Sequence, residues 1–90
     1  MKMHLSSDFY IRFEPEINGG TLYLFNKRSQ KIYKTKRFLY DIIRHINAEE
    51  IEQMIREEYK LPIETNLTDS IHAGIKKLME IGALIDEAEN

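Results

Sequence analysis

The residues that most often carry chemistry are the histidines, and this chain has three: His4, His45 and His72. None lies in a spacing such as His-x-x-x-His or His-x-Glu, which is typical of metal sites. The chain has no cysteine, so it forms neither a thiolate metal site nor a disulfide. We therefore expect no metal ion and no cofactor, and we interpret each histidine as a surface or helix residue.

The adjacent carboxylates and the adjacent glycines are equally poor candidates for catalysis. Acidic pairs at 49–50, 57–58 and 86–87 are neighbours in sequence, so on a helix they point in different directions. Gly19 and Gly20 join two expected strands and no lysine-serine pair follows them, unlike a phosphate-binding loop. Acid–base catalysis would also need a cleft for which so short a chain has little room. We expect that the chain is not an enzyme.

The charge distribution is more informative than the net charge of −2. The small acidic excess argues against a general nucleic-acid binder. Basic side chains gather in one segment that has no acidic residue, and they are Lys27, Arg28, Lys31, Lys34, Lys36 and Arg37. Between Glu49 and Glu64 the balance reverses to acidic. A basic patch favours an acidic partner, although a solvated hairpin with scattered lysines explains the charge equally well.

The bulk composition predicts one globular domain over residues 1–90, because 42% of the residues are hydrophobic and 31% are charged. The N-terminus has no apolar segment typical of a secretory signal, and no apolar run is long enough to span a bilayer. We therefore expect a soluble cytoplasmic protein that does not associate with a membrane.

The first third of the chain predicts three strands. Apolar residues alternate with others over 9–13, Pro15 ends this strand, and the aromatic-rich segment 21–25 predicts the second. Residues 18–20 form a turn signal between them. A short third strand is expected over 31–34. The short loops predict an antiparallel meander with this third strand at its edge.

Two amphipathic helices are expected to follow. Apolar residues over 38–46 recur at helical spacing, and Thr35 is the predicted cap of this first helix. Asn47 is expected to begin the second helix, since Glu50 follows three positions later as in a capping box. The second helix should end before Pro62, because the residue preceding a proline is pushed out of the helical region.

A third helix is expected to start near Thr65 or Asn66 and to end at Gly82, which suits a left-handed C-terminal position. The predicted fold class is therefore α+β: a three-stranded antiparallel sheet followed by three helices, winged-helix-like in character. Because hairpins bury little alone, the helices should pack on one face of the sheet.

The order and spacing of these segments resemble a known family. The segments that carry the resemblance are Ile11-Arg12-Phe13-Glu14-Pro15, Gly19-Gly20-Thr21-Leu22-Tyr23, Lys31-Ile32-Tyr33, Ala48-Glu49-Glu50-Ile51, Tyr59-Lys60-Leu61-Pro62, and the spaced Ser70, Ile71, Leu78, Gly82, Leu84 and Ile85. In this order they resemble the PqqD-like domains, also called precursor-peptide recognition elements. The resemblance covers about residues 9–85. Each segment alone is a generic strand or helix-end signal, and the specificity lies in their succession.

The resemblance implies a non-catalytic peptide chaperone. In such domains the leader segment of a ribosomally synthesised precursor peptide adds as a strand beside the third strand and settles against the third helix. The domain then presents the peptide to a modifying enzyme, typically a radical S-adenosylmethionine enzyme for free-standing members. Carried onto this chain, the peptide-binding residues are Lys31, Ile32, Tyr33, Lys34, Thr35, Ile71, Ile75, Lys76 and Met79.

These helix residues divide into two groups. Ile71 and Ile75 lie on the main apolar stripe, so an ordinary core role explains them as well as a binding role. Lys76 and Met79 lie off that stripe and are the better candidates for a groove. On the strand side, Lys34 and Lys36 would be available to acidic residues of the leader.

Two departures from the family pattern fall near this region. Family members commonly have Leu-Asn after the third strand, where this chain has Thr35-Lys36, and a bulky apolar residue in the third helix, where this chain has Gly74. Both bear on the geometry of the groove. Glycine inside a helix costs about 1 kcal/mol relative to alanine. Gly74 either admits a partner closely or packs against a large neighbour, and we favour the second interpretation.

Two other functions remain open. A winged-helix DNA-binding regulator would use the second and third helices as a helix-turn-helix and the basic hairpin as a wing. Against it, the presumed recognition helix offers only His72, Lys76 and Lys77 near its middle, and the strands precede the helices. A subunit-association domain would instead pair its edge strand with a second copy, giving a homodimer in place of a monomer.

Overall fold

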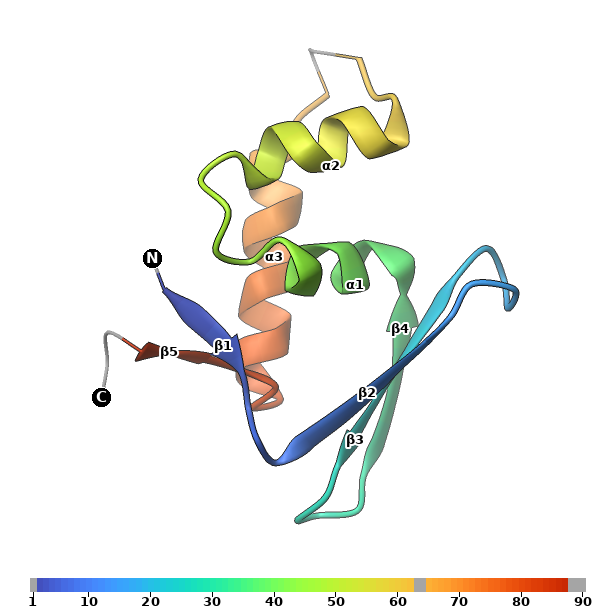
Figure 1. Cartoon of the computed structure of the whole chain (residues 1–90), viewed down its shortest axis with the longest axis vertical. Helices are drawn as coiled ribbons and strands as arrows, with labels where there is room; N and C mark the ends of the chain where they lie inside the picture. The colour runs from blue at the N-terminus through green and yellow to red at the C-terminus, as the bar shows by residue number, and fades with distance from the viewer. Residues whose placement is uncertain (1, 63–64, 88–90) are drawn as a thin grey trace.

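The computed structural model describes residues 2–62 and 65–87 and has an α+β fold (Figure 1). A three-stranded antiparallel sheet has the order β2-β3-β4, and three helices follow it along the chain. These elements are β2 (Phe9–Glu14), β3 (Thr21–Asn26), β4 (Ile32–Lys36), α1 (Arg37–Arg44), α2 (Ile51–Tyr59) and α3 (Thr68–Glu80). The predicted fold class is confirmed. Glu64, the last residue of the acidic stretch, lies outside the described residues.

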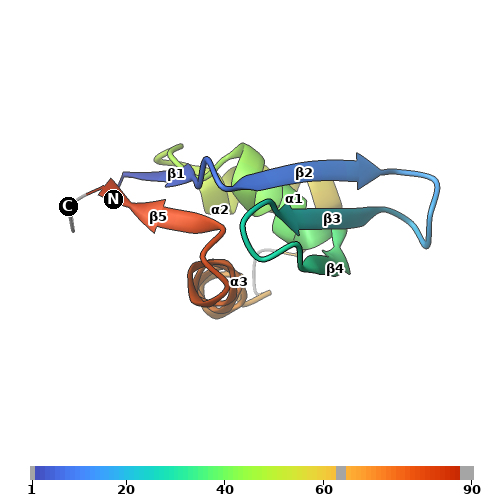
Figure 2. The same cartoon turned by 90° about the horizontal axis from the view of Figure 1, so that it is seen from below.

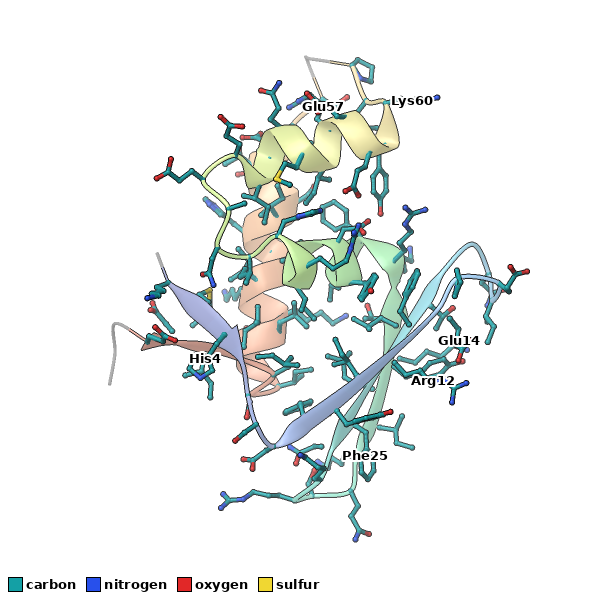
Figure 3. All side chains as sticks on the ribbon, viewed as in Figure 1. His4, Arg12, Glu14, Phe25, Glu57 and Lys60 are labelled. Carbon is teal, nitrogen blue, oxygen red and sulfur yellow. The ribbon has the colours of Figure 1, made fainter. Side chains whose placement is uncertain are left out.

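Two short strands form a second sheet that the sequence did not predict. β1 (Met3–Leu5) pairs antiparallel with β5 (Leu84–Asp86), and His4 Nδ1 lies 3.2 Å from Glu87 Oε1 beside this pair (Figure 3). Met3 is 1% exposed, so the packed structure extends beyond residues 9–85, the span of the family resemblance. This sheet ties the N-terminal segment to the end of α3.

The two faces of the larger sheet differ because successive side chains of a strand point to opposite sides. Leu22 and Leu24 of β3 are fully buried on the face that α1 covers. The opposite face carries Tyr10 and Ile32, which are 64% and 69% exposed. The predicted packing of helices on one face of the sheet is therefore confirmed.

The third strand and the first helix begin later than predicted. The strand runs over Ile32–Lys36, so Thr35 lies inside β4 and does not cap α1. The N-cap of α1 is Lys36, which makes no side-chain capping hydrogen bond. The prediction of Thr35 as a cap is therefore wrong. The extended pairing of Leu22 with Thr35 and of Thr21 with Lys36 holds this segment in the sheet.

The second helix begins at Ile51 and not at Asn47. Asn47 instead pairs with the backbone of β1: its Oδ1 accepts the N–H of Met3 at 2.9 Å, and its Nδ2 donates to the carbonyl of Met3 at 2.8 Å. The capping prediction is wrong because this long-range pair of hydrogen bonds outweighs a local one. The N-cap of α2 is Glu50, and the helix ends at Tyr59, before Pro62 as predicted.

The third helix begins at Thr68, two or three residues later than predicted. Its C-terminal end follows the prediction, since Gly82 has φ +85° and the N–H groups of Gly82 and Ala83 donate to the carbonyls of Met79 and Leu78. No helix within residues 2–62 and 65–87 is long and apolar enough to cross a membrane.

Gly74 marks the crossing of α1 and α3. A Cβ atom on Gly74 would lie 2.5 Å from Cδ1 of Ile42, which is fully buried, and 4.0 Å from Cγ of Leu39. The interpretation that Gly74 packs against a large neighbour is confirmed. Through this close approach α3 contacts α1. In Figure 2, α3 lies on the β4 side of the sheet, away from β2.

Candidate functional site

The open edge of β4 is the first component of the candidate site. β4 pairs only with β3 among the described residues, as predicted for the edge of the meander. The N–H of Asn26 donates to the carbonyl of Lys31 at 2.9 Å, which fixes the hydrogen-bonded pairs of this ladder. Since hydrogen-bonded and non-hydrogen-bonded pairs alternate in an antiparallel ladder, Tyr33 and Thr35 bond to β3. The N–H and C=O groups of Ile32 and Lys34 and the N–H of Lys36 therefore point outward, and we call this the free edge. The C=O of Lys36, the N-cap of α1, accepts the first hydrogen bond of that helix.

A pocket of about 200 Å³ lies between β4 and α3. Leu24 and Leu39 contribute to its wall from β3 and α1. Its lining on β4 and near the C-terminal end of α3 consists of Tyr33, Lys34, Thr35, Lys77, Leu78 and Ile81. Because most of these side chains present carbon atoms, we call it the apolar pocket. It borders the free edge and is large enough for part of an apolar side chain.

A second pocket, of about 510 Å³, lies at the other end of β4. Its lining comes from the β2–β3 turn, the β4–α1 junction and the end of α2, and consists of Asn18, Gly19, Gly20, Thr21, Lys34, Thr35, Lys36, Arg37, Phe38 and Tyr59. We call it the basic pocket, because its charged lining residues are all cationic. Lys34 and Thr35 line both pockets, so the two pockets are neighbours along β4.

A buried carboxylate holds the wall of the basic pocket in place. Asp41 of α1 has no exposed surface, and its Oδ2 accepts a hydrogen bond from the Tyr59 hydroxyl at 2.7 Å. Its Oδ1 accepts one from Arg44 at 2.6 Å, and Nε of Arg37 lies 3.6 Å from Oδ2. Burial, followed by the hydrogen bond to Asp41, raises the pKa of the Tyr59 phenol above its ordinary value. The hydrogen bond to Asp41 likewise raises the pKa of Arg44.

The structure places the predicted strand residues at the free edge. Lys31 precedes β4, and Ile32 and Lys34 are exposed with outward backbone groups. Tyr33 is half-buried and stacks on Phe9, with the ring centroids 6.2 Å apart. These residues form one continuous edge, so the structure brings the strand half of the predicted site together.

The predicted helix residues lie on other faces of α3. Ile71 is a core residue with 4% exposure, and Ile75 packs partly against the same core. Lys76 and Met79 are exposed but do not line the apolar pocket. With 3.6 residues per helical turn, Met79 lies more than a quarter turn from Leu78 on the side away from Lys77. The structure does not bring this half of the predicted site to the groove beside β4.

Sequence reasoning missed the residues that line the pockets on the helical side. Lys77 and Ile81 are one turn apart and flank the buried Leu78, and both face β4. Gly74 was the sequence signal that could have identified these residues. It marks the face of α3 that packs on α1, and once that face is fixed, so is the face of α3 that borders β4. Phe38 and Tyr59, which are partly buried against the core, also line the basic pocket.

The arrangement is suited to binding an extended chain. It combines unpaired backbone donors and acceptors, an apolar pocket on one side and a cationic pocket at one end. Among the described residues, no group of three or more histidine, aspartate or glutamate side chains is placed to hold a metal ion.

Comparisons with models of protein families, with curated proteins and with solved structures find no match to this chain.

Proposed function

We propose that this protein is a non-catalytic peptide chaperone. It binds the leader segment of a ribosomally synthesised precursor peptide as an added strand on β4, and it presents that peptide to a modifying enzyme, with a radical S-adenosylmethionine enzyme as the expected partner. The observation that carries the proposal is the free edge of β4 with the apolar pocket beside it. The resemblance of residues 9–85 to precursor-peptide recognition elements supplies the identity of the ligand and of the enzyme.

The free edge supports strand addition in a specific register. The outward groups of Ile32, Lys34 and Lys36 offer three donors and two acceptors, because the C=O of Lys36 is used by α1. An added strand that bonds to them turns every second side chain toward the helical side, where the apolar pocket lies next to Tyr33 and Thr35. Backbone pairing then supplies affinity for any extended chain, and the pocket supplies selectivity.

A substitution at Ile32 tests the backbone pairing. Ile32→Pro removes an outward N–H while leaving the β3–β4 ladder bonds of its neighbours intact, because proline is tolerated on an edge strand. Ile32→Ala is the matched control, since it removes the same exposed side chain and keeps the N–H. Loss of one backbone hydrogen bond, worth about 1 kcal/mol net, should weaken binding of a leader peptide encoded beside this protein about fivefold relative to Ile32→Ala.

A methyl-resolved NMR titration tests the position of the peptide on α3. We expect the methyl groups of Ile81 and Leu78 to shift on addition of the leader peptide, and those of Ile75 and Met79 to stay in place. Equal affinity of the two Ile32 variants together with shifts confined to Ile75 and Met79 would refute strand addition at β4.

The helix-turn-helix alternative finds less support in the structure. α2 ends at Tyr59 and α3 begins at Thr68, so eight residues separate the two helices in sequence, whereas a helix-turn-helix uses a turn of about three or four residues. The exposed surface of α3 also includes the acidic Asp69 and Glu80 beside its lysines. Saturable, salt-sensitive shifts with duplex DNA and none with peptides would favour that alternative over the one proposed.

A further inference from the structure

The basic pocket continues the line of the free edge beyond the apolar pocket. Lys34 and Lys36 supply outward backbone groups of the edge and also line this pocket. A peptide strand that continues straight along β4 would therefore place side chains next to the basic pocket. We propose that the basic pocket binds a carboxylate side chain of the bound peptide, an inference that rests on the proposed function. Recognition then requires an acidic residue at that position of the peptide.

The free positive charge of the pocket belongs to its two lysines. Arg37 already lies 3.6 Å from Asp41, and its guanidinium carbon sits 5.7 Å from the centre of the Tyr59 ring. Lys34 and Lys36 are exposed, and within residues 2–62 and 65–87 no carboxylate lies within ion-pair distance of either. Their charges are thus available to a ligand, and a carboxylate is the group in a peptide that can neutralise them.

The rest of the pocket wall suits the carbon stem of such a side chain. Phe38 and Tyr59 meet edge to face with ring centroids 6.1 Å apart, and the Tyr59 hydroxyl is fixed on Asp41. Gly20 also lines the pocket and is tightly packed, because a Cβ there would lie 2.9 Å from Phe13 Cζ and 3.0 Å from Arg37 Cβ. Phe38 and Tyr59 can therefore contact the methylene groups of a side chain that enters the pocket.

The start of α1 adds to the positive potential at this site. α1 has no acidic residue in its first turn, and its N-cap makes no side-chain hydrogen bond. Positive charge at the N-terminus of a helix favours an anion within about one turn. A free phosphate could use the same field, and so the experiment includes it. The continuity of the pocket with the free edge favours a carboxylate carried by a peptide.

The experiment is a selection of random 12-residue peptides on the wild-type protein and on two variants. Lys36→Glu reverses a charge in the basic pocket, and Lys76→Glu makes the same change in net charge on an exposed part of α3 outside both pockets. We expect peptides enriched on wild type and on Lys76→Glu to share an acidic residue, and peptides enriched on Lys36→Glu to lose it. In a peptide so selected, replacing that Glu by Gln should weaken binding about fivefold, the upper range for an exposed ion pair.

A charge swap completes the test. Replacing the acidic peptide residue by Lys should restore binding to Lys36→Glu and weaken binding to wild type, and high salt should reduce both effects. Enriched peptides that pair with β4 but show no acidic preference would overturn this inference and leave the proposed function intact. Enrichment of no peptide would overturn both. Saturable amide shifts at residues 36–38 with inorganic phosphate, without an acidic preference among peptides, would assign the pocket to a phosphate.

Discussion

Asp41 is the residue whose replacement should most clearly show how the helical layer is held together. Its carboxylate has no exposed surface and lies between the Tyr59 hydroxyl at 2.7 Å and the Arg44 guanidinium at 2.6 Å. Arg44 also contacts Glu58 of α2 at 3.0 Å, so this network joins α1 to α2. Asp41→Asn keeps the size of the side chain and one acceptor, and it removes the negative charge.

The expected loss of stability follows from the two hydrogen bonds. Hydrogen bonds to charged groups contribute about 1.5–3 kcal/mol each, against about 1 kcal/mol for neutral ones. Neutralising Asp41 therefore weakens its bonds to Tyr59 and Arg44 by about 1 kcal/mol or more each. Burying the neutral asparagine costs less desolvation free energy than burying the carboxylate, and this difference offsets part of the lost stability. We expect the free energy of unfolding to fall by about 2 kcal/mol and Tm to fall by roughly 10 °C for a domain of this size.

Urea and thermal unfolding followed by circular dichroism would measure this change. Asp8→Asn is the matched control, because Asp8 is a half-exposed carboxylate 3.6 Å from Arg28. Such an exposed pair contributes less than about 1 kcal/mol. If Asp41→Asn lost no more stability than Asp8→Asn, the buried network would not hold α1 against α2, and the reasoning would be refuted.

Three further predictions concern single contacts. Gly74→Ala should destabilise the fold by about 1–3 kcal/mol despite its better helix propensity, and adding Ile42→Val, which removes the clashing Cδ1, should recover part of the loss in thermal unfolding. Because burial raises the pKa of Tyr59, its stabilising contribution is complete below about pH 10 and is lost as pH rises above that value. The unfolding free energy should therefore fall by up to about 1.4 kcal/mol per pH unit there, and the difference between wild type and Tyr59→Phe should narrow between pH 9 and pH 11 in urea titrations. Asn47→Ala removes two hydrogen bonds to the backbone of Met3 and should speed hydrogen exchange of that amide at least tenfold, with no change expected at β3 amides.

The sheet and the ends of the helices could be predicted because their signals are local. Alternation over residues 9–13, the turn at 18–20 and the left-handed glycine at Gly82 each depend on the residues immediately around them. Pro62 marks the end of α2 for the same reason. The packing role of Gly74 was predictable as well, since a glycine within an apolar helix favours close approach of another element.

The errors in prediction share a long-range cause. Asn47 has the local features of a helix cap, but its side chain bonds to Met3, which is 44 residues away. β1 and β5 contain three residues each, too few to show a period, and each depends on the other for its hydrogen bonds. The face of α3 that borders β4 was also not predictable from its apolar stripe. The apolar stripe shows which side of α3 is buried. Which element lies next to each edge of that stripe depends on how α1 packs against α3.

The lysines that we propose to bind an acidic peptide residue also oppose pairing of β4 with a second copy of itself. In an antiparallel pairing of two free edges centred on Lys34, this residue would face its own copy and Ile32 would face Lys36. Like charges directly opposite one another destabilise a strand pair, and lysines on exposed edges are a common protection against self-association. An acidic peptide reverses the sign of this interaction while using the same backbone groups. The charge of β4 therefore opposes self-pairing of its open edge, and this agrees with the proposed peptide ligand better than with a dimer formed through β4.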